Sequence, residues 1–324
     1  MAKNDFVIKD GVLTEYNDEV VIPYGVKEIG EGIFEDSSAS KIIIPDTVEI
    51  IGDDAFRGAA FKEINLPDSI LKIGNGAFED CINLESVRLP KNLKEIGDYA
   101  FYNCESIKFF AVPDSVEKIG KDAFDFVGEP EYIKLPKNLK VLGRITVEEP
   151  NEAARIELDK DNENFVIEND ILYDKEKTKA LYGWGDFLIS DGALIDYRGS
   201  DRDVEVPKGV RKINEFAFSG KSIETVTMCD DVEEIETDAF SDSPMLKSVI
   251  FSDNIKVISD ILNGCENLEY IRLPKLLEKI EKDAFFCTSK PKRLEIDSQN
   301  KNFYIKNGVL YDKNNKKISF EEDY

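Results

Sequence analysis

One stretch recurs with variations along the sequence: Leu84-Glu-Ser-Val-Arg-Leu-Pro-Lys-Asn-Leu-Lys-Glu-Ile-Gly-Asp-Tyr-Ala-Phe-Tyr-Asn-Cys104. Counted from each proline, the shared pattern is Pro-x-x-Val/Leu-x-x-Ile-Gly-x-x-Ala-Phe-x-x-Cys. The prolines that anchor it follow one another at intervals of 22 or 23 residues, at Pro23, Pro45, Pro67, Pro90, Pro113 and Pro136. A fixed period of this length predicts a repeat solenoid of stacked coils.

The residues before each proline predict a short strand. Val87 and Leu89 alternate with Ser86 and Arg88, so a period of two sends the apolar pair inward and the polar pair to solvent. Pro90 ends the strand because it lacks the backbone donor that a ladder needs.

The residues after each proline predict a turn and a buried ring. Leu93 and Ile96 place two more apolar groups inward, and Gly97 allows the chain to turn. The pair Ala100-Phe101 is typical of a short helical turn that places a ring in the core, and Cys104 is a small buried filler. One coil cannot bury its own apolar face, so we expect the coils to stack.

This Ile-Pro…Val-x-x-Ile-Gly…Ala-Phe-x-x-Cys signature resembles the BspA-like leucine-rich repeat family of bacterial proteins. The resemblance covers nearly the whole chain. It implies a curved right-handed leucine-rich-repeat superhelix used for protein–protein or adhesive binding. It implies no catalytic residues, because the family has no common active site.

The repeats predict two modules, residues 1–182 and 183–324. We expect a cap hairpin, six coils and a closing hairpin in the first, and a cap hairpin, four coils and a closing hairpin in the second. Asp10-Gly11 and Asp191-Gly192, each between alternating apolar residues, are hairpin signals for the two starting caps. The stretches 164–173 and 302–311 resemble each other and predict the two closing hairpins.

The second module departs from the pattern at two places. Its third coil carries Ile261-Leu-Asn263 where the others have Ala-Phe, so we expect less regular turns there. The glycine position holds larger residues, namely Asn214, Glu236, Ser259 and Glu281.

The charge and the hydropathy pattern exclude several partners. A net charge of −24 argues against nucleic acid and against an anionic membrane surface. No apolar run reaches membrane-spanning length, so we expect no membrane insertion. The first thirty residues carry acids and no apolar signal-peptide core, which predicts a cytoplasmic protein if Met1 is the native start. The alternative is a secreted or cell-surface protein whose signal peptide has been removed.

The chain contains no histidine, which removes histidine-based triads and imidazole metal ligands. We therefore predict no enzyme activity and no cofactor. The stretch Asp159-Lys-Asp161-Asn-Glu163 has oxygen ligands at alternate positions, as at the start of a calcium loop. It lacks the glycine at the sixth place, and its duplicate at 297–302 has lost two of the acids, so a solvated turn is the favoured interpretation.

Two cysteine pairs are one coil apart, Cys81 with Cys104 and Cys265 with Cys287. Stacking would bring each pair within disulfide reach. Buried thiols are the favoured interpretation for a cytosolic chain.

The outward positions of the predicted strands point to a binding face. Only one of the sixteen residues there is acidic, in a chain where acids outnumber bases 66 to 42. Aromatic residues with arginine and few acids are typical of an interface core, although strand surfaces favour aromatic and β-branched residues in any case. The candidate binding residues are Arg88, Phe109, Tyr132, Lys134, Ile250, Tyr270 and Arg272. The leading hypothesis is a scaffold that binds a partner protein of unknown identity through this face, and the alternative is a glycan-binding or adhesive module.

Overall fold

The computed structural model describes residues 7–9, 12–15, 20–107, 111–127, 132–145, 155–282, 284–285, 288 and 290–320. These residues form short strands and turns, and no helix occurs among them. The chain divides into two compact units, Met1–Phe165 and Val166–Tyr324.

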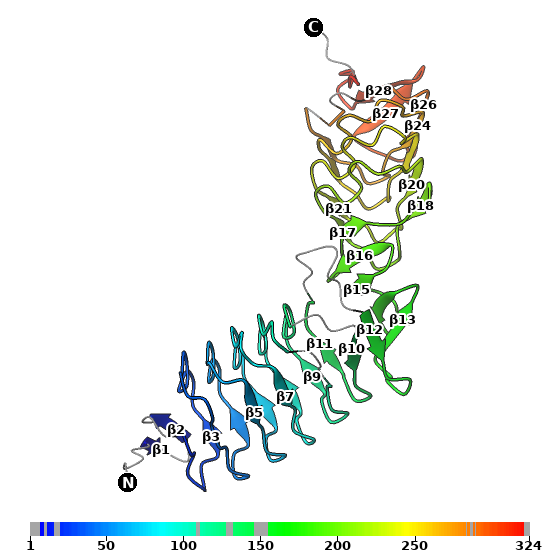
Figure 1. The fold of residues 1–324 in the computed structure, drawn as a ribbon. Coiled ribbons are helices and arrows are strands. Elements are labelled where there is room, and N and C mark those ends of the chain that lie inside the picture. The colour runs from blue at the N-terminus through cyan, green and yellow to red at the C-terminus, as the bar shows by residue number, and fades with distance from the viewer. Residues whose placement is uncertain are drawn as a thin grey trace. The chain divides into compact units, whose positions relative to one another are not determined.

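The strands of the first unit form two rows, one before and one after the repeat prolines (Figure 1). Before Pro23, Pro45 and Pro113 the described part of the first row has only isolated bridges, Val21 with Ile43 and Ala111 with Lys134. The row before the proline contains β5 (Glu63–Asn65), β7 (Ser86–Arg88), β10 (Tyr132–Leu135) and β12 (Arg155–Leu158), paired in parallel as β5–β7 and β10–β12. The row after the proline is one sheet that contains β3 (Glu28–Ile29), β4 (Ile50–Ile51), β6 (Lys72–Ile73), β8 (Glu95–Ile96), β9 (Lys118–Ile119) and β11 (Val141–Leu142).

The second unit repeats this arrangement. Its row before the proline is a parallel five-stranded sheet of β18 (Asp203–Glu205), β20 (Thr225–Thr227), β22 (Ser248–Ile250), β24 (Tyr270–Arg272) and β26 (Arg293–Glu295). Its row after the proline contains β19 (Lys212–Ile213), β21 (Glu234–Ile235), β23 (Val257–Ile258) and β25 (Lys279–Ile280). We call the row before the proline, in either unit, the strand ladder.

Hairpins lie at the predicted starts and ends of the arrays. At the start of the first unit, β1 (Val7–Lys9) pairs antiparallel with β2 (Val12–Glu15), and β2 continues in parallel to β3. At the corresponding place in the second unit, β16 (Phe187–Ser190) pairs with β17 (Ala193–Tyr197), and β17 continues to β19. The predicted closing hairpins are β13 (Phe165–Glu168) with β14 (Ile171–Asp174) and β27 (Phe303–Lys306) with β28 (Val309–Asp312).

The first closing hairpin lies in a sheet of the second unit. β14 pairs antiparallel with β15 (Ala180–Trp184), and β15 pairs with β16, so β13 to β17 form one continuous meander. Along the sequence, the boundary between the two compact units therefore falls between Phe165 and Val166. The repeats predict the module boundary later, between residues 182 and 183. Which fragments fold alone remains a prediction.

The turn at Ala100-Phe101 differs from the expected helical turn. The amides of Tyr99, Phe101 and Asn103 donate to carbonyls of the next coil at 2.8–2.9 Å rather than to residues four positions earlier in the chain. Tyr99 and Asn103 also have positive φ angles, 56° and 57°, which no right-handed helix contains. Hydrogen bonds between coils therefore replace those of a helix.

The predicted ring ladder forms the core of the first unit. Neighbouring rings of Phe34, Phe56, Phe78 and Phe101 stack with centroids 5.0–5.2 Å apart, and Phe124 follows at 5.9 Å. Each of the first four rings is fully buried. Truncation of one such ring to alanine should cost about 3–5 kcal/mol.

A column of glycines allows close stacking beside these rings. A Cβ atom on Gly97 would lie 2.5 Å from the carbonyl carbon of Gly74, and one on Gly120 would lie 2.4 Å from that of Gly97. The second unit has larger residues at this position, and its row after the proline is split, because β21 ends one sheet and β23–β25 form another. The sequence predicted less regular turns in this unit, and the split concerns its strands, so the expectation about the turns stays a prediction.

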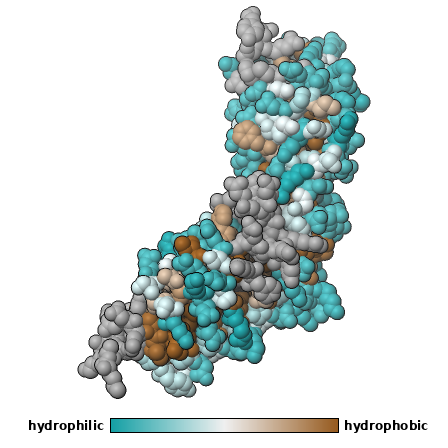
Figure 2. Space-filling view, viewed as in Figure 1, coloured by the Kyte–Doolittle hydropathy of each residue, from teal (hydrophilic) through white to brown (hydrophobic). Residues whose placement is uncertain are grey.

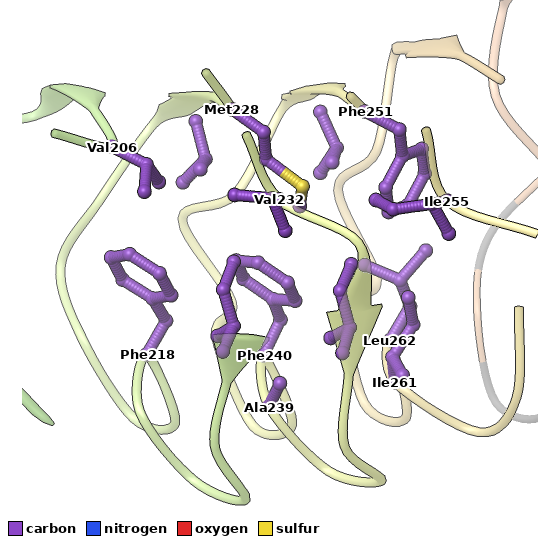
Figure 3. Close-up of a cluster of buried hydrophobic side chains, with 14 of the residues drawn as sticks. Val206, Phe218, Met228, Val232, Ala239, Phe240, Phe251, Ile255, Ile261 and Leu262 are labelled. Carbon is purple, nitrogen blue, oxygen red and sulfur yellow. The ribbon is translucent and has the colours of Figure 1, made fainter. Parts of the chain in front are cut away.

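In the coil that lacks Ala-Phe, an aromatic side chain near the strand fills the space of the missing ring. Figure 3 shows Ile261 and Leu262 at the end of the row in which Phe218 and Phe240 lie, with the ring of Phe251 above them. The two preceding coils carry Val206 and Met228 at the position of Phe251. The ring that is missing from the turn is thus replaced by one from the strand, and all these side chains are buried.

Candidate functional site

The strand ladder has the side-chain phase that the sequence predicted. In the second unit, the inward residues Val226, Val249 and Ile271 are completely buried, while their flanking residues are half-exposed. The outward residues of three neighbouring strands therefore share one surface, which we call the central patch: Thr225, Thr227, Ser248, Ile250, Tyr270 and Arg272.

Three of the seven candidate residues are brought together in this patch. Ile250 lies directly opposite Arg272 in the ladder, and Tyr270 is in the same strand as Arg272. The guanidinium of Arg272 donates to both carboxylate oxygens of Asp253 at 2.9 and 3.1 Å and to the carbonyl of Phe251 at 3.3 Å. Its charge is thus neutralised within the fold.

Tyr270 is held by the next strand. Its hydroxyl donates to Oε2 of Glu295 at 2.7 Å, and the guanidinium of Arg293 lies 5.1 Å from the centre of its ring. Burial and the neighbouring Glu295 raise the pKa of Tyr270, while the hydrogen bond from Tyr270 and the nearby Arg293 lower the pKa of Glu295. These contacts fix the orientation of the ring.

The other four candidates belong to the first unit. Arg88 donates to Asp68 of the preceding coil at 3.0 Å, in the same relation as Arg272 to Asp253, and Lys134 lies 3.9 Å from Asp159. Phe109 lies outside the described residues, and of Tyr132 only the backbone is described. Their predicted outward positions therefore stay predictions.

Sequence reasoning missed the end strands of the ladder. β18 and β26 bring three acids to the outward positions, Asp203, Glu205 and Glu295, so in the second unit the low acid content holds for the three central strands only. The signal was present, since Asp203 and Arg293 lie at the repeat distance from Thr225 and Tyr270.

A row of alternating charges runs beside the ladder of the second unit. Glu224 contacts Arg202 at 2.7 Å and Lys247 at 2.6 Å, and Glu269 contacts Lys292 at 2.7 Å. Hydrogen bonds from Lys247 and Arg202 lower the pKa of Glu224. Because each partner is in a neighbouring coil, these pairs favour the observed stacking register.

Exposed apolar side chains also occur at the start of the first unit. Val21 and Ile43 form an isolated bridge between neighbouring coils and are 47% and 48% exposed. In Figure 2 the visible surface is mostly hydrophilic, and apolar residues gather over the N-terminal coils.

The calcium-loop candidate forms a turn whose two aspartates have partners within the fold. The amide of Asp161 donates to Asp159 Oδ1 at 3.0 Å, Lys134 and Lys137 lie 3.9 and 3.8 Å from the two aspartates, and Glu163 is exposed. Among the described residues no three or more carboxylate or thiol side chains are grouped so that they could hold a metal ion.

The residues that both closing turns share make the capping contacts. The side-chain amide of Asn162 donates to the carbonyls of Pro136 and Leu139, and that of Asn300 donates to those of Lys275 and Leu277. The two asparagines thus bind carbonyl groups of the preceding coil at the end of each array.

The described cysteines are free thiols. Cys81, Cys104 and Cys265 are buried and Cys229 is half-buried, while Cys287 lies outside the described residues. Burial raises the pKa of Cys81 and Cys265 to about 12 and that of Cys104 further, so these thiols stay protonated. Within the described ranges, no helix has the length and apolar character needed to cross a membrane.

Comparisons with known proteins agree with this architecture. A family model described as "BspA type Leucine rich repeat region (6 copies)" matches residues 16–165 and 197–321. No curated protein sequence matches the chain significantly.

Two solved structures have the same kind of fold. One is a leucine rich cell surface protein from Faecalibacterium prausnitzii, with 24% identity, a TM-score of 0.50, and coverage of 92% of this chain and 95% of that chain. The other is a leucine-rich repeat protein from Eubacterium ventriosum, with 19% identity, a TM-score of 0.51, and coverage of 91% and 83%.

Proposed function

Because the chain belongs to the BspA-type leucine-rich repeat family, we propose that it is a non-enzymatic interaction module that binds a partner protein through its strand ladder. Repeat solenoids present extended surfaces of this kind for binding. The central patch of the second unit is the surface that we assign to the partner.

The composition of the central patch supports this assignment. Its only charged side chain, Arg272, is already paired with Asp253, whereas the chain as a whole carries a net charge of −24. A nearly neutral surface with a tyrosine, an isoleucine and an arginine has the make-up of an interface core, from which charged residues are depleted. The charged rows and end strands around it would form the polar rim.

We further propose that the module works at a cell surface. The support is the Faecalibacterium prausnitzii neighbour, which is described as a leucine rich cell surface protein. Fractionation of the native host, with an antibody against the protein, tests this location; recovery with the cytosolic fraction alone would contradict it.

Affinity capture tests the patch, with the purified protein as bait and surface extracts of the native organism's cells as the source of partners. The wild-type protein should retain a partner that the Ile250→Ala/Tyr270→Ala double variant loses, because such anchors each contribute about 2 kcal/mol or more when they are hot spots. Leu276→Ala/Val257→Ala is the matched control, since both residues are exposed apolar groups of the same unit outside the ladder. Equal losses in the two double variants would contradict binding at the patch.

The glycan-binding alternative needs exposed rings on which a sugar can stack. The ring of Tyr270 is less accessible for stacking on a sugar, because the guanidinium of Arg293 lies over it and its hydroxyl donates to Glu295. A glycan array separates the two functions: binding to a defined sugar that is lost in Tyr270→Ala would favour the adhesive module over the protein scaffold.

A further inference from the structure

We propose that the open edge of β26 binds an extended peptide segment of a partner, which adds to the ladder as one more parallel strand. The segment carries apolar side chains at alternate positions and a basic residue. This site borders the central patch at Arg272 but differs from it, because it uses the backbone at the end of the ladder. It does not require that the patch itself bind anything.

The backbone of β26 is paired on one side only. The amide of Arg293 donates to the carbonyl of Glu269, and the carbonyl of Glu295 accepts from the amide of Leu273, both at 2.8 Å. Peptide groups of a strand alternate in direction, so the N–H and C=O of Leu294 face away from β24. Among the described strands, none pairs with that side of β26. The edge is therefore a template for another strand.

A cavity of about 380 Å³ lies at this edge. Its lining residues are Arg272, Leu294, Glu295, Ile296, Asp297 and Ile305. Glu295 points to the outer face of the ladder and Leu294 to the inner face, and a cavity can contact both faces of one strand only at its edge. The hairpin strand β27 contributes Ile305 on the opposite side. The volume is within the range of sites that bind small ligands or a few peptide residues.

The floor of the cavity is an uncovered part of the core. Leu294 and Ile296 occupy the positions that Ile271 and Leu273 have one coil earlier, where the exposed fractions are 0% and 1%. In the last coil both residues, and Ile305, are only half-buried. An added strand would cover them with its inward side chains, as each coil covers the one before, so apolar residues at those positions are favoured.

The charges of the cavity indicate a cationic side chain in the segment. Arg272 is paired with Asp253, and Glu295 is paired with Arg293. Asp297 forms no ion pair with any described residue, and its Oδ1 accepts only the amide hydrogen of Gln299, at 2.7 Å. A lysine or arginine beside Asp297 would supply the missing positive charge.

The chain provides its own probe, because β24 already occupies the equivalent place one coil earlier. The peptide is residues 268–275, Leu-Glu-Tyr-Ile-Arg-Leu-Pro-Lys, with an acetylated N-terminus, an amidated C-terminus and a fluorescent label. In the fold, the amide of Tyr270 donates to the carbonyl of Lys247 at 2.9 Å. In the added strand, the peptide's tyrosine and arginine amides would likewise donate to the carbonyls of Lys292 and Leu294.

Fluorescence anisotropy with the full-length protein tests the proposal through N-methylated peptides. Methylation of the tyrosine or the arginine nitrogen should weaken binding about tenfold, because each removes one hydrogen bond to β26. Methylation of the isoleucine nitrogen, which faces away from β26, should change the affinity less than about twofold and is the matched control. Equal effects at the three nitrogens, or no binding of the unmodified peptide, would overturn the proposal.

Two protein variants locate the site. Asp297→Asn keeps the acceptor for Gln299 and removes the charge. At low salt this variant should bind the peptide about two- to fivefold more weakly than the wild type does. Its affinity for a peptide in which norleucine replaces the lysine should equal that of the wild type. Leu294→Pro removes an amide that the fold does not use and should abolish binding, provided that its thermal transition stays cooperative. Unchanged binding in both variants would overturn the assignment to β26, even if the peptide binds elsewhere.

Discussion

The thiol of Cys104 donates a hydrogen bond to the carbonyl oxygen of Phe78, one coil earlier in the stack, with Sγ 3.1 Å from the oxygen. The same position makes the same contact in other coils, from Cys81 to Phe56, Cys265 to Phe240, Ser243 to Phe218 and Thr288 to Leu262. The repeat therefore requires a small buried side chain with a donor in these coils, and cysteine is one of three residues that supply it.

Cys104→Ser should consequently be tolerated, with a loss of less than about 1 kcal/mol in the free energy of unfolding. Cys104→Ala removes the thiol donor and a buried sulfur atom, while the amide of Cys81 still donates to the carbonyl of Phe78 at 3.2 Å, so the variant should cost about 1–2 kcal/mol. Urea denaturation of both variants measures the difference. If serine destabilises as much as alanine, the contact with Phe78 is not what the position selects.

The asparagine caps give a second prediction. The side chain of Asn300 makes four hydrogen bonds. Its nitrogen donates to the carbonyls of Lys275 and Leu277, and its oxygen accepts from the backbone amides of Asn302 and Phe303. Asn300→Ala should therefore lower the free energy of unfolding by about 1–3 kcal/mol, as read from thermal or urea unfolding.

Lys301→Ala is the control for the cap, because Lys301 is the exposed neighbour of Asn300, and its effect should stay within about 0.5 kcal/mol. Asn162→Ala should behave like Asn300→Ala, since the side chain of Asn162 also makes four hydrogen bonds, two to carbonyls of the preceding coil and two from backbone amides that follow it. A destabilising effect of Lys301→Ala alone would show that the cap has been misassigned.

The recurring prolines and phenylalanines predicted the coil period, the side-chain phase of the ladder and the ring stack, because these depend on spacing within one coil. The contacts of Arg272 with Asp253 and of Tyr270 with Glu295 join different coils, and no local pattern indicates which outward residues will pair. The prediction of a helical turn at Phe101 is wrong for the same reason. The amide of Phe101 donates to Ala123 in the following coil, and no local pattern indicates that contact.

Gly97 tests how closely the coils approach. A Cβ atom there would lie 2.5 Å from the backbone of Gly74 and 2.6 Å from that of Asn75, so the backbone would have to move. Gly97→Ala should cost about 1–3 kcal/mol or more in the free energy of unfolding. Ser259→Ala, at the same repeat position in the second unit, should be nearly neutral, and similar losses in the two variants would contradict the role of close stacking.

Fragments test the two units. Residues 1–182 expressed alone should melt cooperatively, because capped repeat arrays can fold without their neighbours. Residues 1–165 should be about as stable, since β13 and β14 join the sheet of the second unit through β15. Circular dichroism and calorimetry measure both transitions. If 1–182 is unfolded, the hairpins are not independent caps and the chain is one indivisible array.

Asp68 links stability to pH. Its carboxylate accepts the backbone amide of Lys91 at 3.0 Å and contacts the side chains of Lys91 at 3.1 Å and Arg88 at 3.0 Å. These groups, with Lys91 contributing most, lower the pKa of Asp68 from 3.8 to about 2.

Because the pKa of Asp68 is lower in the folded state, its contribution to stability is complete above about pH 4 and is lost as the pH falls toward 2. Asp68→Asn should lower the melting temperature at pH 5, and the difference from wild type should shrink at pH 2.5. Asp46→Asn is the matched control, since Asp46 also follows a repeat proline but forms no ion pair with a described residue, so its difference from wild type should be smaller at pH 5. A constant difference for Asp68→Asn across this range would mean that the ion pairs with Arg88 and Lys91 contribute nothing to the fold.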